Sequence, residues 1–341
     1  MTQKPIIYYK KNAIPKGVEI IEAFNGCLEE LFFIRNPRYK KQMPEAKKPL
    51  LEFIQKKNAI KSVWIYYPWI NKAVHCPEKN IFFEIKTARN KNIITKEEQN
   101  NYRKFKLGIM GLSIGSNIVW PLIASGGSEF LRIADADTIE ISNLNRMLAP
   151  LSALGENKAE FMAKKIYEMD PFIELDCWAE YVTEKNIEKF ISGLDLLIDE
   201  IDNLYLKFLS RKIARKRGIP LIMVTNVGNN VILDVERFDL EKNRPILHGF
   251  FGNMKEEELK NPPFPKWVQL ANKIVGMENL NARMKKTISD IGKKIAAVPQ
   301  IAPTALIAGS AVVYLIRAIA NRQKIASGRY FLNIDKAFKQ Q

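Results

Sequence analysis

A buried strand that runs into a glycine turn and then into a helix constrains this chain more than any other feature of its sequence. Lys106–Met110 is a short, largely apolar run typical of a buried parallel strand, and Ser116–Ser125 has the composition of a buried helix. Gly111-Leu112-Ser113-Ile114-Gly115 interrupts both patterns between them. Such a turn directs the free N–H groups of a helix N-terminus above the strand, and its glycines let a ligand approach the backbone. The segment therefore predicts a phosphate-binding turn.

Strands and helices alternate over the rest of the central region. A second strand, Leu131–Ala134, ends at Asp135, where a carboxylate can bind ribose hydroxyls in a nucleotide-binding βαβ unit. The alternation predicts an α/β fold with a Rossmann-like, mainly parallel sheet, right-handed crossovers and helices on both faces. Ligands bind such sheets outside the carboxyl ends of the strands. Three more strands are expected at Glu174–Trp178, Leu194–Ile198 and Leu221–Val224.

Polar motifs follow the second strand in a fixed order: Asp135-Ala136-Asp137, Ser142-Asn143-Leu144-Asn145-Arg146, Gly155-Glu156-Asn157-Lys158-Ala159 and Asp199-Glu200-Ile201-Asp202-Asn203. With the glycine turn, they resemble the ThiF/MoeB superfamily of ubiquitin-activating-enzyme-like adenylyltransferases, over about residues 85 to 240. The motifs Tyr67-Pro68-Trp69, Arg89-Asn90 and Asp234-Val235-Glu236-Arg237-Phe238-Asp239 resemble the bacterial branch often fused to a nitroreductase domain, although this sequence contains no such domain.

The resemblance implies a Mg-ATP site in which each residue has a role. Asp135 would hold the ribose, Arg146 and Lys158 the phosphates, and Asp202 the magnesium ion. These residue types suit attack on the α-phosphorus, because fixed cations and a hard metal ion stabilise charge on phosphate oxygens. Asn143 would hold the loop and the triphosphate. The other expected nucleotide-binding residues are Gly111, Ser113, Gly115, Asp137, Asn145, Asn203 and Arg89, the last reaching into the site of a partner subunit in a homodimer.

This chain departs from the superfamily pattern in three ways. Its turn is one residue shorter and lacks one glycine. The paired Cys-x-x-Cys motifs of a structural zinc site are missing, so no zinc is expected. The only cysteines are Cys27, Cys76 and Cys177, and none follows at the position expected for a thioester-forming residue. The adenylated group is therefore expected to be captured directly, in a condensation, cyclisation or dehydration without an enzyme thioester.

The expected enzyme adenylates a carboxylate or amide oxygen of a peptide or small acid, and the acceptor could be a ribosomally made peptide that is being modified.

Three alternatives to this function remain. One is an ATP-dependent tRNA-modifying dehydratase. Another is a NAD-binding or catalytically inactive module, against which Arg146, Lys158 and Asp202 argue. The third is a serine hydrolase, because Gly-x-Ser-x-Gly is also a nucleophile elbow and Ser113, Asp199 or Asp202 and His248 occur in the hydrolase order. That alternative leaves the Ser142–Arg146 motif unexplained, and both histidines, His75 and His248, are interpreted as structural.

Composition agrees with a cytoplasmic enzyme. The 341 residues carry 53 basic and 37 acidic side chains, a formal charge of +16 that attracts ATP, acidic peptides and RNA, with RNA the less favoured partner. Thr304–Ile316 is an uncharged helix shorter than the roughly 20 residues that span a bilayer, so no membrane association is expected.

Two domains are expected. Residues 1–84 form a small α/β appendage for recognition or dimer packing, and residues 85–341 form the adenylation domain with a helical and strand closure. In the appendage, the sequence predicts helices at Val18–Phe33 and Leu50–Lys57 and a strand at Ser62–Tyr67. Beyond the central region it predicts a loop over the site at Asn261–Pro265, helices at Arg283–Ala297 and Thr304–Arg322, and a closing strand at Gly328–Ile334.

Overall fold

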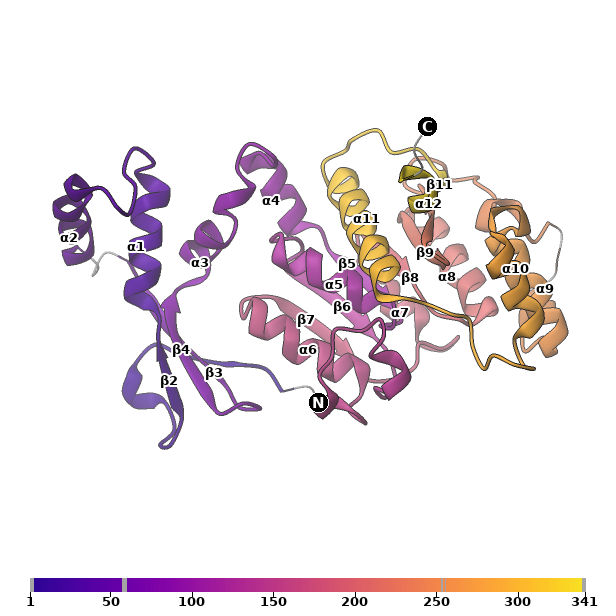
Figure 1. Cartoon of the computed structure of the whole chain (residues 1–341), viewed down its shortest axis with the longest axis horizontal. Helices are drawn as coiled ribbons and strands as arrows, with labels where there is room; N and C mark the ends of the chain where they lie inside the picture. The colour runs from indigo at the N-terminus through magenta and orange to yellow at the C-terminus, as the bar shows by residue number, and fades with distance from the viewer. Residues whose placement is uncertain (1–2, 57–59, 253, 255, 339–341) are drawn as a thin grey trace. The chain divides into compact units, whose positions relative to one another are not determined.

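The computed structural model describes residues 3–56, 60–252, 254 and 256–338, which form two compact units (Figure 1). The first unit comprises the chain up to Gln99 together with Lys164–Ile173. The second comprises Asn100–Ala163 and Glu174 onwards. Helix α6 (Lys158–Met169) therefore contributes to both units, and α4 (Lys96–Lys104) contains the boundary at Gln99.

The second unit contains the expected Rossmann-like α/β fold. Its sheet has the strand order β11-β10-β9-β8-β5-β6-β7, in which β7, β6, β5, β8 and β9 run parallel and β10 and β11 are antiparallel additions. The strands are β5 (Leu107–Met110), β6 (Phe130–Ala134), β7 (Glu174–Trp178), β8 (Leu196–Asp199), β9 (Leu221–Val227), β10 (Asn230–Glu236) and β11 (Gly328–Leu332).

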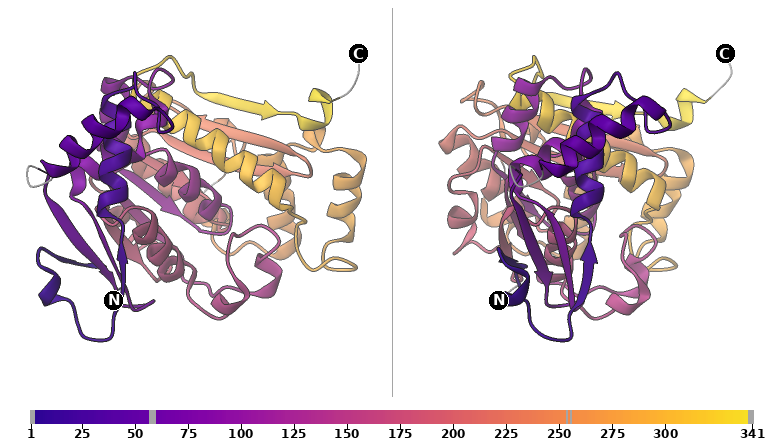
Figure 2. Two further views of the ribbon diagram at one scale, coloured as in Figure 1. Left: turned by 60° about the vertical axis from the view of Figure 1, so that its left-hand side comes forward. Right: turned by 90° about the vertical axis from the view of Figure 1, so that its left-hand side faces the viewer.

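Helices cover both faces of this sheet, because neighbouring strand residues point to opposite sides. On β5, Met110 packs with α7 (Ile187–Ile191) and α8 (Leu204–Arg217), whereas Ile109 lies beneath the start of α5 (Gly115–Ala124). Helix α11 (Ala302–Ala320) packs against α5 and lies along the sheet (Figure 2). A Cβ at Gly309 would lie 2.1 Å from the Asn117 carbonyl oxygen, so only glycine allows these two helices to approach so closely.

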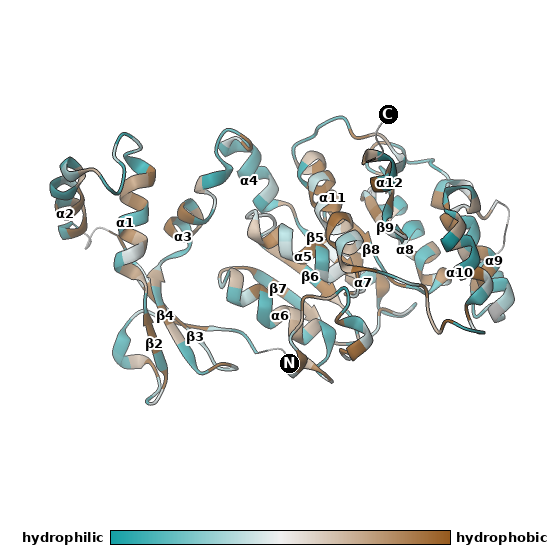
Figure 3. Cartoon of the chain, viewed as in Figure 1, coloured by the Kyte–Doolittle hydropathy of each residue, from teal (hydrophilic) through white to brown (hydrophobic). Residues whose placement is uncertain are grey.

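Helix α11 has the length and apolar composition of a membrane-spanning helix, and it is prominent in the hydropathy colouring of Figure 3. However, 56% of its most apolar window is buried, and it contacts α5, β9 and β10. Core helices of soluble proteins share this composition. The helix is therefore weak evidence for a membrane span.

The first unit contains a four-stranded sheet of order β1-β3-β4-β2. Strand β3 is antiparallel to β1 and β4, and β2 is parallel to β4. Helix α1 packs against β4, α2 and α3. The elements are β1 (Ile6–Tyr8), β2 (Glu19–Glu22), α1 (Phe24–Arg35), α2 (Lys47–Gln55), β3 (Ser62–Tyr67), β4 (Lys72–Pro77) and α3 (Lys79–Lys86).

Local pairing and turns changed some predicted boundaries. The helix predicted from Val18 begins at Phe24, because Glu19–Glu22 pairs with β4 as a strand. The helix predicted near Leu50 begins at Lys47 and ends at Gln55, and its predicted last residue, Lys57, lies outside the described residues.

Further along the chain, the helix predicted to reach Ala297 is α10 (Ala282–Asp290). It ends before Gly292, which has φ +77°. Helix α9 (Phe264–Val275) precedes α10, and α12 (Ile334–Ala337) is the last helix among the described residues.

Candidate nucleotide-binding site

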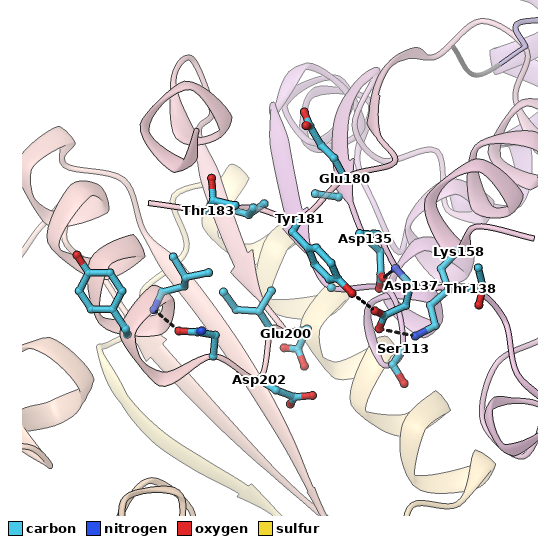
Figure 4. Close-up of a pocket in the computed structure, with 18 of the residues that line it drawn as sticks. Ser113, Asp135, Asp137, Thr138, Lys158, Glu180, Tyr181, Thr183, Glu200 and Asp202 are labelled. Carbon is cyan, nitrogen blue, oxygen red and sulfur yellow. Dashed lines mark hydrogen bonds and ion pairs between the residues drawn. The ribbon is translucent and has the colours of Figure 1, made fainter. Parts of the chain in front are cut away.

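A cavity of about 1080 Å³ lies at the carboxyl ends of the parallel strands of the second unit. The loops after β5, β6, β7 and β8 all contribute to its wall, as expected for ligands of an α/β sheet. Figure 4 shows side chains from these loops converging on the same space. The predicted residues that line it are Gly111, Ser113, Asp135, Asp137, Asn143, Arg146, Lys158, Asp202 and Asn203.

The glycine turn has a backbone that other residues would not adopt easily. Gly111 has φ +88°, and a Cβ there would lie 2.6 Å from the Glu200 carbonyl oxygen. Helix α5 begins at Gly115, so its N-terminal N–H groups follow directly after the turn. The predicted turn is thus present, and Gly111 brings the loops after β5 and β8 into contact.

Asp135 is fixed by backbone donors on both sides. The Leu112 N–H donates to Oδ2 at 2.7 Å, and the Asp137 N–H donates to Oδ1 at 2.9 Å. Burial raises the pKa of Asp135 above its ordinary value, while the N–H of Leu112 and the charge of Lys158 favour the carboxylate. The carboxyl group therefore joins the glycine turn to the loop after β6, at the wall of the cavity.

Arg146 connects its own loop to the turn. Its Nε donates to the Ser113 Oγ at 2.9 Å, and its Nη1 donates to the Ser142 carbonyl and the Asn145 Oδ1, each at 3.0 Å. Burial lowers the pKa of Arg146, and the charge of Asp202 acts against this effect. The guanidinium is therefore held over the turn, within electrostatic reach of the predicted metal ligand.

Asn143 shapes the loop that carries this arginine. It is 6% exposed, and its Oδ1 accepts from the Glu140 N–H at 3.1 Å in a reciprocal capping arrangement. Asn145 instead donates to the Gln300 carbonyl at 2.7 Å, and it is not among the residues that line the cavity. The structure therefore brings Asn143 to the cavity and uses Asn145 to anchor the loop.

Lys158, Asp137 and Tyr181 form a chain of contacts across the cavity wall (Figure 4). The Lys158 Nζ donates to the Asp137 Oδ2 at 3.0 Å, and the Tyr181 hydroxyl donates to Oδ1 at 2.8 Å. Burial alone would raise the pKa of Asp137, but these two hydrogen bonds outweigh it and hold the pKa below its ordinary value. Lys158 is only 6% exposed, so its ammonium is oriented by the carboxylate rather than solvated.

The last residue of β8 and the loop after it carry three acidic side chains in different surroundings. Asp199 is fully buried and paired with Arg211 and Lys207, which identifies it as structural. The Glu200 Oε1 accepts from the Val224 N–H at 2.8 Å, and burial raises the pKa of Glu200 to about 8. Asp202 lines the cavity beyond them. Glu200 also lines the cavity, and Asp202 differs from it in that its charge acts on Arg146.

Asn203 caps α8, because its Oδ1 accepts from the Leu206 N–H at 2.9 Å. Asn203 also lines the cavity, but its side-chain oxygen already serves the structure as this helix cap.

Gly115 lies at the start of α5 and is not among the cavity-lining residues. Arg89 lies on a 3₁₀ turn, Ala88–Asn90, in the first unit.

Sequence reasoning missed two groups in the cavity wall. One is Tyr181, three residues beyond the end of β7. The other is a cluster in which the Glu184 carboxylate accepts from the Tyr205 hydroxyl at 2.7 Å and from the Lys260 Nζ at 3.0 Å. Lys260 and Asn261 bring the predicted covering loop to the cavity. No motif identifies these residues, because their proximity depends on the tertiary fold.

The cavity has an acidic excess. Seven acidic side chains and three basic ones line it, and of the acidic ones Glu200 is mainly protonated at neutral pH because its pKa is raised to about 8. The acidic residues are Asp135, Asp137, Glu140, Glu180, Glu184, Glu200 and Asp202, and the basic ones are Arg146, Lys158 and Lys260. A ligand that brings its own cation suits this charge balance, since Mg²⁺ commonly uses one or two protein carboxylates together with substrate phosphates. Within the described residues, no group of three or more His, Cys, Asp or Glu side chains could hold a metal ion alone.

Among the residues that the structure describes, no base hydrogen-bonds to Ser113, as the hydrolase alternative requires. The Ser113 Oγ accepts a hydrogen bond from Arg146. His248 lies 3.0 Å from the Asp234 carboxylate and contacts Arg244 at 2.8 Å, and it is not among the residues that line the cavity. A serine nucleophile needs a base within hydrogen-bond reach.

Comparison with known proteins identifies the family of this chain. Residues 87–340 match the ThiF family. An uncharacterized protein, MT1398, of Mycobacterium tuberculosis (strain CDC 1551 / Oshkosh) is 32% identical over 80% of this chain and 38% of its own length. A tRNA threonylcarbamoyladenosine dehydratase of Bacillus subtilis (strain 168) is 32% identical over 45% of this chain and 60% of its own length. The chain thus spans less than two thirds of either relative.

A solved structure supports the fold. The crystal structure of selenomethionine PaaA has a TM-score of 0.50 and 20% sequence identity, and the match covers 74% of this chain and 77% of that one. Relatives of this chain include enzymes named as adenylyltransferases, such as a sulfur carrier protein adenylyltransferase.

Proposed function

The chain belongs to the ThiF family, and we propose from this premise that it uses Mg-ATP to adenylate a carboxylate or amide oxygen of a peptide or small acid, releasing pyrophosphate. The observation that carries this proposal is the convergence of Asp135, Arg146, Lys158 and Asp202 on one cavity at the ends of β5, β6 and β8. The carboxylate of Asp135 suits a ribose, the cations of Arg146 and Lys158 suit a triphosphate, and the carboxylate of Asp202 suits a metal ion.

The proposed reaction assigns a task to each residue. The acceptor oxygen attacks the α-phosphorus, and the bond to the pyrophosphate leaving group breaks. Asp135 accepts from the ribose hydroxyls, and Lys158 and Arg146 stabilise the charge on the phosphate oxygens. Asp202 would hold Mg²⁺, which when bound neutralises charge on the leaving pyrophosphate. The carboxylate chemistry and acidic excess of the cavity fit this ion.

The cysteines support direct capture of the adenylated group. Burial raises the pKa of the Cys76 thiol to about 12 and also raises that of Cys27, so neither is a thiolate at neutral pH. Cys177 lies within β7 and is not among the cavity-lining residues. An amine, carbanion or internal nucleophile of the acceptor would therefore complete a condensation, cyclisation or dehydration.

ATP binding and acceptor choice can be tested separately. Calorimetry should detect ATP binding in the presence of Mg²⁺ and no preference for NAD; tight NAD binding without ATP binding would refute the proposal. ATP–pyrophosphate exchange measured with pools of carboxylic acids, synthetic peptides and total tRNA then tests the acceptor. Exchange that depends on an acid or peptide supports the stated substrate class.

A tRNA-modifying dehydratase is the second candidate. It is supported by the similarity to a tRNA threonylcarbamoyladenosine dehydratase and by the formal charge of +16. Nucleic-acid binding falls steeply with salt because counterions are released. ATP turnover that depends on tRNA, and is lost as salt rises, would favour this candidate over the peptide or small-acid acceptor.

A homodimer is also proposed. Apolar side chains are exposed on two segments of the second unit that Asn145 and Gln300 join by a hydrogen bond of 2.7 Å. They are Ile141 (70% exposed), Leu148 (50%), Leu151 (67%), Val298 (47%) and Ile301 (43%). Light scattering should give a dimer mass that Leu151→Glu reduces and that Leu240→Glu, at a leucine of similar exposure (69%) elsewhere in the second unit, leaves unchanged. A monomeric wild type would contradict this proposal.

We further propose that Arg89 acts in the partner's site of this dimer. Each of Arg89→Ala and Asp202→Asn should lose exchange activity alone. A mixed dimer would contain one complete site, because an Asp202→Asn subunit supplies Arg89 to a subunit with an intact Asp202. Recovery of activity on mixing is the expected result, and no recovery in proven mixed dimers would contradict it.

The domain roles, the family branch and the compartment complete the proposal. Residues 85–341 would carry adenylation, and residues 1–84 would serve recognition or dimer packing. The nearest branch would be the bacterial one often fused to a nitroreductase domain. A cytoplasmic location fits cysteines that are free among the described residues. Fractionation of cells that express the full protein checks the compartment.

A further inference from the structure

A serine, a histidine and a glutamate form a connected line across the sheet of the first unit. The His75 Nε2 lies 2.8 Å from the Ser62 Oγ, and the His75 Nδ1 lies 2.5 Å from the Glu22 Oε1. This is the nucleophile–base–carboxylate order of serine hydrolases, in which each link is a hydrogen bond. The adenylation site uses none of these three residues.

Strand register brings the three side chains together. Glu22 on β2 and Trp64 on β3 are both paired with His75 on β4, and paired residues of neighbouring strands point to the same face. Ser62 precedes Trp64 by two residues, so it shares that face. The line is therefore built into the sheet and does not depend on a flexible loop.

Aromatic contacts fix the plane of the imidazole. The Trp64 ring stacks on the His75 ring at a centroid distance of 4.1 Å and an interplanar angle of 4°, and the Phe24 ring lies 4.9 Å away. The aromatic face also stabilises a positive charge on the histidine. The His75 side chain is 16% exposed and that of Glu22 is 50% exposed, so the base is sheltered while the carboxylate end is open to solvent.

Within the described part of the chain, the backbone at Ser62 offers one donor for a developing oxyanion. The Lys61 carbonyl accepts from the Glu78 N–H, so the backbone groups of Lys61 point toward β4. The backbone groups of the next residue, Ser62, point the opposite way, toward β1. Strand β1 ends at Tyr8, which is paired with Trp64, so the pairing of β1 with β3 ends before it reaches Ser62. The N–H of the nucleophile itself is one of the oxyanion donors in serine proteases.

From this geometry we propose that Ser62 is a second reactive centre of the chain, a nucleophile that accepts the acyl group of small activated esters. The Ser62 Oγ attacks the carbonyl carbon while its proton passes to the His75 Nε2, with Glu22 stabilising the imidazolium. The bond to the alkoxy group breaks, and His75 gives the proton to the leaving alcohol. Water then attacks the acyl-serine by the same route, releasing the acid and regenerating Ser62.

The test uses the full-length protein and a fluorophosphonate probe, which modifies activated serines. Mass spectrometry of the labelled peptides should locate the probe on Ser62. His75→Gln should slow labelling at least about a hundredfold, because a positioned general base contributes that much. Glu22→Gln should slow it at least about tenfold through loss of imidazole orientation. The matched control is Ser289→Ala, because the Ser289 hydroxyl donates to the Lys286 carbonyl rather than to a base, and this variant should leave labelling unchanged.

Hydrolysis of p-nitrophenyl acetate provides the catalytic readout, and it should disappear in Ser62→Ala. Thermal melting of each variant distinguishes a lost nucleophile from a lost fold, and mapping of the probe on the wild type requires no substitution. ATP–pyrophosphate exchange should be retained by Ser62→Ala, which separates this proposal from the adenylation proposal. Absence of label on wild-type Ser62, or equal labelling of folded His75→Gln, would overturn the assignment.

Discussion

Replacing the proposed magnesium ligand and the turn serine separately distinguishes adenylation from hydrolysis in the same cavity. Asp202→Asn keeps the shape of the side chain but removes the negative charge that faces Arg146 and the proposed metal ion. Loss of a single preorganised electrostatic group typically costs about 10²–10³ in rate. We therefore expect ATP–pyrophosphate exchange to fall at least about a hundredfold, equivalent to roughly 2.7 kcal/mol.

Ser113→Ala should have a much smaller effect. It removes one hydrogen bond, between the Arg146 Nε and the Ser113 Oγ at 2.9 Å, and leaves the backbone of the turn intact. Arg146 keeps the Ser142 carbonyl and the Asn145 Oδ1 as partners, and its half-exposed guanidinium can be solvated by water. A hydrogen bond to a charged group contributes about 1.5–3 kcal/mol when buried. About 1 kcal/mol, or a fivefold loss, is the expected result in this partly solvated position.

The assay is exchange of labelled pyrophosphate into ATP with the cognate acceptor. Asp195→Asn is the matched control, because Asp195 precedes β8, at the end of the strand opposite to Asp202, and its carboxylate accepts a hydrogen bond from the Lys106 backbone N–H at the surface. It should retain nearly full activity. An inactive Ser113→Ala beside an active Asp202→Asn would refute the adenylation assignment and favour a serine nucleophile.

Three further results are expected. Joint replacement of the three cysteines by serine should leave turnover within about tenfold, because buried thiols affect packing more than chemistry; isolation of a substrate thioester would contradict this. In the absence of metal, the free energy of unfolding should fall as pH rises from about 4.5 to about 8, because Glu200, with its raised pKa, binds more protons in the folded than in the unfolded state over this pH range. Glu200→Gln should flatten this dependence in denaturant titrations at several pH values. An unchanged pH dependence in the variant would contradict the prediction. Gly309→Ala should destabilise the fold by about 3 kcal/mol because its Cβ would meet the Asn117 carbonyl at 2.1 Å. Gly26→Ala, at a helical position with open space, should instead stabilise the fold by up to about 1 kcal/mol, because alanine favours a helix more than glycine does. Equal melting temperatures for the two variants would refute the packing argument.

The sequence predicted the parallel sheet and its ligand-binding edge because these depend on local patterns. Apolar runs of strand length alternate with helices, and Gly111, Asp135 and Asp202 each directly follow a strand or lie a few residues beyond it. Parallel strands in one sheet bring their carboxyl ends together, so spacing along the chain translates into proximity in space. The closing strand predicted at Gly328–Ile334 is confirmed as β11 (Gly328–Leu332), whereas β10 was not predicted, since a strand added through a hairpin obeys no βαβ rule.

The rest of the cavity wall could not be predicted, because its contacts join residues that are far apart in the sequence. Tyr181 reaches Asp137 across 44 residues, and Lys260 reaches Glu184 across 76, so neither contact leaves a spacing signal. The same holds in the first unit, where three separate strands supply Glu22, Ser62 and His75. The sequence interpretation of His75 as a structural residue weighed it alone, whereas a base is defined by its neighbours. Some residues acquire their chemistry only from partners on another strand or loop, so they become candidate site residues only when the strand register and the loop contacts are known. The Tyr181 contact with the Lys158–Asp137 pair and the Ser62–His75–Glu22 line are two such cases.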